Sequence, residues 1–233
     1  MYMSNIFIIP EWFLGYDMAL EVIFAAVTLL VSYYAWKIHK TTEERNIRLF
    51  SMAFLFISLS YFVQCVLNLI ILRQLEDEIT GFIGLQSIYH LNLFGIYFHS
   101  ILFLIGLLLL TYIALKIYSL QTFVLLFLLV FSSLYFSPYK TFMLYLLSTV
   151  LLGFIVYYYI ANYWKNRKAT TLMVLIAMIL LFVGYLHFMF AMDNPMYYVV
   201  GHALELCAYV LVLINLLIIL RVGKQRRKNG KKT

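Results

Sequence analysis

Long apolar runs constrain this chain more than any other feature of its sequence. A helix that crosses a bilayer needs roughly 20 mostly apolar residues, and seven runs bounded by polar or turn residues approach or exceed that length. They cover residues 16–36, 49–72, 91–115, 121–137, 141–164, 169–191 and 197–220. The mean hydropathy of +0.94 excludes a soluble globular domain of ordinary composition. We therefore expect an all-α, polytopic membrane bundle with seven transmembrane helices.

The basic residues predict how these helices are oriented. Lysine and arginine concentrate in the cytoplasmic loops of membrane proteins. If the N-terminus lies outside, all 17 basic residues except Arg73 and Lys140 fall in inner loops or in the C-terminal segment. Leaving out the fourth helix, which is the shortest, would move the loop around Lys165 to the wrong side. The pattern predicts a multi-pass protein of the cell membrane, with its N-terminus outside and its C-terminus in the cytoplasm.

The chain divides into a membrane part and a short basic tail. Residues 1–221 form the expected seven-helix transmembrane domain, and residues 222–233 form the basic cytoplasmic tail. Each basic residue near an anionic leaflet adds roughly 1 kcal/mol of attraction, so the net charge of +7 needs no nucleic acid to explain it. The expected partners are the bilayer, anionic inner-leaflet lipids at the tail, and a cytoplasmic or membrane protein, because the chain contains no output domain of its own.

Polar side chains gather in the outer halves of the predicted helices. A rise of 1.5 Å per residue puts them roughly 6–12 Å below the outer helix ends. A charge at this depth costs about 2.5 kcal/mol or more unless it is paired or hydrated. We therefore expect a polar ligand site there. The candidate ligand-binding residues are Glu205, His202, His99, Gln64, Asn68, Glu21 and Tyr209.

Helical spacing supports a shared site. His202, Glu205 and Tyr209 follow i, i+3, i+7 spacing and lie on one side of the last predicted helix. Gln64 and Asn68 are one turn apart on the second. Glu205 is the strongest candidate, because it is the one acid deep in an otherwise apolar helix. The alternative for the same residues is a polar clamp that fixes helix packing and binds nothing.

The same side chains leave other functions open. His99, His202, Glu205 and His187 are candidate metal ligands, since histidine and carboxylate bind zinc, and two histidines on different helices can hold haem. Zinc with an open position would suggest lipid hydrolysis, and haem an electron carrier, although the HExxH motif is absent. A proton or small-solute transporter would use Glu205 and the histidines as a relay. No catalytic residue and no cofactor is assigned, so the sequence favours a non-enzymatic module.

The first loop and the last helix carry a resemblance to a known class of membrane segment. The stretch TTEERNIRLFSMAFLF, Thr41 to Phe56, and the GHALEL that begins at Gly201 resemble the small prokaryotic seven-helix segments that occur alone or as the sensors of histidine kinases. The resemblance covers the whole chain and implies a sensor-like or accessory module, without naming a ligand. No lysine lies between Tyr197 and Leu220, where a microbial rhodopsin needs one for retinal.

Overall fold

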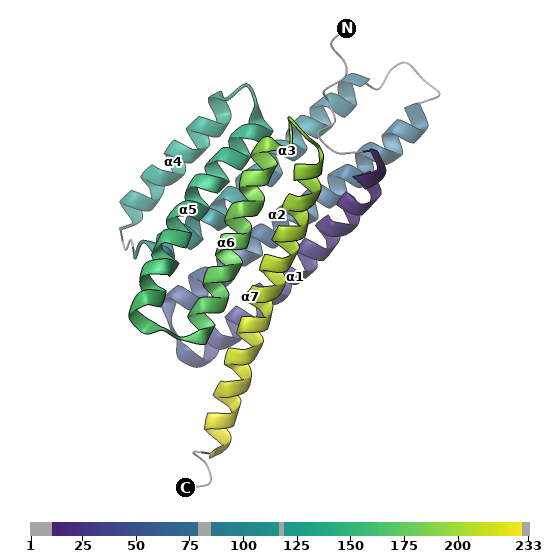
Figure 1. The fold of residues 1–233 in the computed structure, drawn as a ribbon. Helices are drawn as coiled ribbons and strands as arrows, with labels where there is room; N and C mark the ends of the chain where they lie inside the picture. Colours follow the sequence, from purple (N-terminus) through teal and green to yellow (C-terminus); the bar gives the residue numbers. More distant parts are fainter. Residues whose placement is uncertain (1–10, 79–84, 117–118, 230–233) are drawn as a thin grey trace.

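The computed structural model describes residues 11–78, 85–116 and 119–229, and every regular element within these ranges is a helix (Figure 1). A short 3-10 helix, η1, spans Glu11–Phe13 and is followed by seven α-helices. Their bounds are α1 Leu14–Thr42, α2 Arg45–Glu78, α3 Leu85–Ala114, α4 Leu120–Phe136, α5 Lys140–Asn166, α6 Ala169–Phe190 and α7 Met196–Asn229. Six of these, all except α4, are long and apolar enough to cross a membrane. The chain is therefore a multi-pass membrane protein.

Two of the helices are much longer than the apolar runs that predict them. The helices α2 and α7 each contain 34 residues, a length of roughly 51 Å, whereas the hydrocarbon core of a bilayer is about 30 Å thick. Helix α7 continues to Asn229. The predicted tail, residues 222–233, therefore begins as a continuation of the last helix, and residues 230–233 lie outside the described residues.

The six long helices form a closed ring. Helix α1 packs against α2 and α7, α2 against α3, and α3 against α5, while α6 lies between α5 and α7. Inside the ring the side chains of Phe54, Leu104, Leu152 and Met178 are fully buried. Helix α4 lies outside the ring against α3 and α5, at the edge of the bundle in Figure 1.

Helix α4 returns the chain along the outside of this ring. The ring of Phe123, near the start of α4, lies 5.5 Å from the ring of Tyr112, near the end of α3. Lys140, which follows the end of α4, lies over the ring of Tyr97, near the start of the apolar part of α3. Ser119 caps the first turn of α4, and the Lys140 ammonium group donates to two carbonyl groups at its end. Helix α4 therefore runs antiparallel to α3.

Small and hydroxyl-bearing residues let α1, α2 and α3 approach closely. A Cβ atom at Gly106 of α3 would lie 2.8 Å from the carbonyl oxygen of Ala53 of α2. The hydroxyl groups of Ser32 on α1 and Ser51 on α2 each donate to the other residue's carbonyl oxygen at 2.8 Å. Such contacts satisfy polar groups that have no water partner in lipid. These contacts hold α1, α2 and α3 together as one side of the ring.

Candidate functional site

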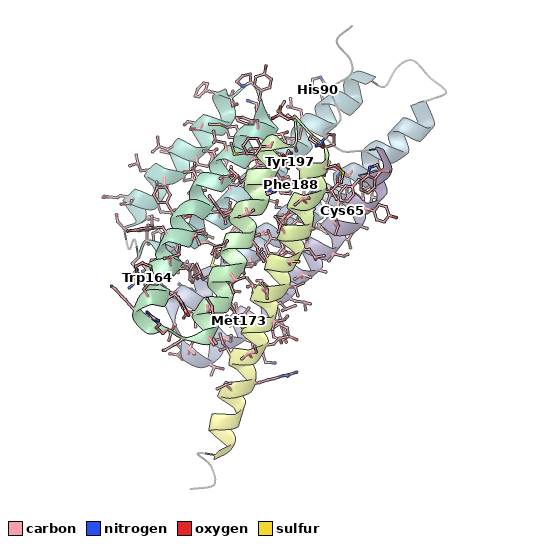
Figure 2. All side chains as sticks on the ribbon, in the orientation of Figure 1. Cys65, His90, Trp164, Met173, Phe188 and Tyr197 are labelled. Carbon is pink, nitrogen blue, oxygen red and sulfur yellow. The ribbon has the colours of Figure 1, made fainter. Side chains whose placement is uncertain are left out.

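Polar side chains of α1, α2, α6 and α7 meet inside the ring near the end at which α1 and α7 begin. This end, called the upper end below, is at the top of Figure 1. In Figure 2, Phe188 and Tyr197 lie at the upper end, whereas Trp164 and Met173 lie towards the opposite, lower end. The contacts below decide which of the seven predicted ligand-binding residues form one site.

Glu205 of α7 is the centre of the site, with only 1% of its surface exposed. Tyr61 of α2 donates a hydrogen bond to its Oε1 atom. Tyr185 of α6 and Tyr209 of α7 donate to the same oxygen at 3.1 and 3.2 Å. The hydroxyl groups of Tyr61 and Tyr209 are also within 3.0 Å of each other. Phenol groups from three helices therefore supply the hydrogen bonds that a buried carboxylate needs in place of water.

His202 connects Glu205 to the first helix. Its Nδ1 atom lies 3.4 Å from Oε2 of Glu205, and its Nε2 atom lies 3.2 Å from Oδ1 of Asp17. These are ion-pair distances, but neither ring nitrogen is aligned for a hydrogen bond within the described residues. A neutral imidazole carries a single N–H. His202 can therefore interact favourably with both acids only if its ring carries two protons or if one of the two carboxyl groups is protonated.

Aromatic rings pack around His202 and leave 8% of the residue exposed. The Tyr198 and Phe188 rings lie 4.4 and 4.8 Å from the imidazole, and Phe24 stacks on it at 5.6 Å. The Tyr198 hydroxyl group donates to Oδ1 of Asp17 at 3.0 Å. A Cβ atom at Gly201 would overlap the Phe188 ring, so the glycine is what lets Phe188 pack so closely to His202.

A second polar group joins α1 to α2 beside the first. Asn68 donates through Nδ2 to both carboxylate oxygens of Glu21, at 2.9 and 3.1 Å. The Nε2 atom of Gln64 lies 3.5 Å from Oδ1 of Asn68. The Oε1 atom of Gln64 is buried without a hydrogen-bond partner in the described parts of the chain. Glu21 lies one turn from Asp17 on α1. The two groups therefore share the same face of the first helix.

His99 and His187 make other contacts. The Nδ1 atom of His99 on α3 lies 2.7 Å from the hydroxyl oxygen of Ser60 on α2, and the His99 ring touches Tyr61 only edge to face. The Nδ1 atom of His187 lies 2.7 Å from the carbonyl oxygen of Val183, within α6. Of the four predicted metal candidates, only His202 and Glu205 contact each other. Across residues 11–78, 85–116 and 119–229, no three histidine, cysteine or acidic side chains are arranged to hold a metal ion.

Four residues that contact the site in the structure are not among the seven predicted ligand-binding residues. Helical spacing could have predicted Asp17 and Tyr61, because Asp17 lies one turn from Glu21 and Tyr61 lies one turn from Gln64 on the same helical faces. Tyr198 sits where an interfacial tyrosine is expected, but it is buried against Asp17. For Tyr185, no spacing rule within α6 indicates a contact with a carboxylate on α7.

The site contains more acids than bases. Asp17, Glu21 and Glu205 are all buried, and in the described residues His202 is the one basic side chain at ion-pair distance from any of them, facing Asp17 and Glu205. We call these four residues the charge cluster. Uncompensated charge inside a membrane protein is costly. The charge cluster is therefore suited to hold protons or another small positively charged group.

Comparison of the chain with protein-family models, with curated proteins and with solved structures finds no match. The functional proposal therefore depends on the geometry and chemistry of the site.

Proposed function

We propose that this chain is a sensor-like or accessory module of the cell membrane, with seven transmembrane helices, its N-terminus outside and its C-terminus in the cytoplasm. The antiparallel course of α4 along α3 supports seven crossings, because 17 residues extend roughly 26 Å. Basic residues such as Arg45, Lys165 and Arg221 at the lower end support the orientation. The upper end, with the charge cluster, then faces the outside.

The stimulus in this proposal is a small polar or cationic ligand that reaches the charge cluster. The observation that carries the proposal is the position of His202, buried between Asp17 and Glu205 without an aligned hydrogen bond on either ring nitrogen. Each acid contacts a different set of helices. A ligand that neutralises one of them would therefore change how tightly α1 is held to α7.

A packed aromatic path supports a readout at the lower end. Tyr209 bonds to Glu205 and lies 6.3 Å, ring to ring, from Phe54 of α2. Phe54 lies 4.8 Å from Phe50, which is five residues from the start of α2 at the lower end. Cores that are close-packed transmit displacement instead of absorbing it. The path gives a change at Glu205 a physical route to the cytoplasmic face, and coupling along it is measurable.

Amide hydrogen exchange of the Glu205→Gln protein in lipid nanodiscs tests this proposal. Glutamine keeps the size and an acceptor oxygen of the side chain but removes the negative charge opposite His202. We expect faster exchange at the upper ends of α1 and α7 and also at the lower end, in residues 35–50 and 212–219. Faster exchange confined to the upper end would show a static packing clamp and contradict the sensor proposal.

The matched control is His99→Ala. His99 lies in the same half of the bundle, but its ring nitrogen contacts Ser60 and not the charge cluster. We expect this variant to loosen α3 against α2 and to leave exchange in residues 212–219 unchanged. An equal response of both variants would indicate general destabilisation of the bundle.

A further inference from the structure

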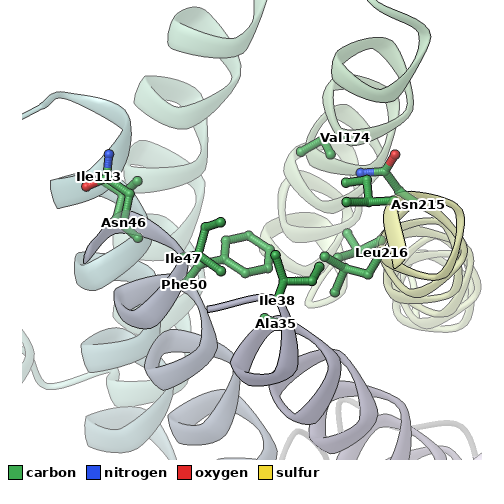
Figure 3. A pocket seen from close by; sticks show the side chains of 11 residues that line it. Ala35, Ile38, Asn46, Ile47, Phe50, Ile113, Val174, Asn215 and Leu216 are labelled. Atoms are coloured by element: carbon green, nitrogen blue, oxygen red, sulfur yellow. The ribbon is translucent and has the colours of Figure 1, made fainter. Parts of the chain in front are cut away.

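A cavity of about 260 Å³ opens inside the ring at the lower end, away from the charge cluster (Figure 3). Helices α1, α2, α3, α6 and α7 line it, and no charged side chain is among the lining residues. Ile38, Phe50, Val174 and Leu216 supply much of its apolar wall. Along α7 the cavity begins roughly 10–15 Å from Glu205. A ligand in it would not touch the charge cluster.

Two asparagine side chains, Asn46 and Asn215, are among the lining residues, and Asn215 has an unsatisfied polar atom. Its side chain is buried, with 3% of the residue exposed, and its Oδ1 atom has no hydrogen-bond partner within the described residues. Figure 3 shows the Asn215 amide projecting from α7 beside Val174 of α6. Buried polar groups are paired in nearly all folded proteins. Apolar walls with a few well-placed polar groups are typical of pockets that bind small molecules.

We propose that this cavity binds an uncharged, membrane-soluble alcohol, a molecule with an apolar body and one hydroxyl group. The lack of charge on the walls disfavours an ion, and the aliphatic and aromatic lining favours a hydrocarbon body. A hydroxyl group both donates and accepts, so it can donate to Oδ1 of Asn215 and accept from Nδ2. The proposal does not depend on the function assigned to the charge cluster.

Photolabelling with a diazirine derivative of n-octanol in lipid nanodiscs tests this site. We expect peptide mass spectrometry to find adducts in residues 35–50 and 212–219, and excess n-octanol to suppress them more strongly than n-octane, which lacks the hydroxyl group. Labelling spread over the lipid-facing side chains, without competition by n-octanol, would overturn the proposal.

Two substitutions on α7 distinguish labelling in the cavity from labelling at the lipid-facing surface. Val212 lines the cavity and is 1% exposed, whereas Val210 is 37% exposed. Val212→Phe should fill the cavity and lower labelling of residues 212–219 roughly tenfold, and Val210→Phe should leave it unchanged. If Val212→Phe does not fold, Val174→Phe fills the same space from α6. Equal labelling of cavity-filled and wild-type protein contradicts a bound ligand there.

Asn215→Leu tests the hydroxyl group separately. This substitution removes the buried amide of Asn215 and leaves that of Asn46 in place. If Asn215 recognises the hydroxyl group, we expect n-octanol to lose its competitive advantage over n-octane. If n-octanol still competes better than n-octane in the variant, Asn215 does not recognise the hydroxyl group and the assignment of an alcohol is wrong. Thermal unfolding of each variant in the same nanodiscs verifies that the bundle remains folded.

Discussion

At Glu205, three phenol hydroxyl groups and one imidazole ring surround a carboxylate that is 1% exposed. Removing one donor leaves an acceptor less well satisfied, and the cost depends on whether the remaining donors can compensate. Because Tyr61 also contacts Tyr209, its hydroxyl group links two members of the site. The contribution of each donor to the free energy of unfolding can therefore be measured by replacing its tyrosine with phenylalanine.

We predict that Tyr61→Phe lowers the free energy of unfolding by about 1–2 kcal/mol, at the upper range of hydrogen bonds inside membrane proteins. Tyr185→Phe should cost less, because the Tyr185 hydroxyl group bonds to Glu205 alone among the described residues, whereas the Tyr61 hydroxyl group contacts both Glu205 and Tyr209. Reversible unfolding in mixed micelles measures both effects. Tyr159→Phe on α5 is the matched control, since no hydrogen bond of its hydroxyl group is found in the described structure. A loss in Tyr159→Phe as large as in Tyr61→Phe would contradict this assignment.

At the scale of the helices, α2 and α3 approach closely because Gly106 of α3 has no side chain at the point of contact. We predict that Gly106→Ala destabilises the bundle by about 1–3 kcal/mol through overpacking, because the new Cβ would meet Ile57 and the backbone oxygen of Ala53. Gly15→Ala on α1 is the control, since nothing lies within 4 Å of its added Cβ. Chemical denaturation of the two variants measures the difference. Equal stabilities would show that α2 and α3 move apart without cost.

The elements also show which features the sequence could predict. Apolar runs locate the seven α-helices of the described residues because length and hydropathy are local properties. Helical periodicity groups His202, Glu205 and Tyr209 on one face, and in the structure Glu205 contacts both of the others. Counting residues from a helix end gives depth but not rotation about the helix axis. His99 therefore matches Glu205 in depth, yet its ring nitrogen faces Ser60. The contact of α3 with α5, which leaves α4 outside the ring, joins segments distant in the chain and has no local signal.

At the scale of the whole molecule, the two ends of the ring differ in chemistry. The upper end holds the charge cluster, and the lower end holds an apolar cavity whose lining includes two amides, those of Asn46 and Asn215. Tyr209, Phe54 and Phe50 lie between them in one packed series. In the proposed sensor-like module, the upper end would meet the polar ligand and the lower end would respond.

The proposed membrane crossings predict which loops face the outside. In a background with Cys65 and Cys207 replaced by alanine, we expect a membrane-impermeant maleimide to label Ser137→Cys and Asn194→Cys in intact cells. Glu43→Cys and Arg167→Cys should react only after the cells are opened. If Ser137→Cys also requires opened cells, α4 does not cross the membrane and the seven-crossing proposal is wrong.

The most direct test of the charge cluster as one unit is a double-mutant cycle on the free energy of unfolding with Asp17→Asn and Glu205→Gln. In the structure both acids face the same imidazole from opposite ring nitrogens, one at 3.2 Å and the other at 3.4 Å. Because His202 joins the two acids, we predict a coupling energy of about 1 kcal/mol or more, beyond the roughly 0.3–0.5 kcal/mol within which independent sites add. Effects that add within that limit would contradict a shared cluster and leave two separate polar contacts.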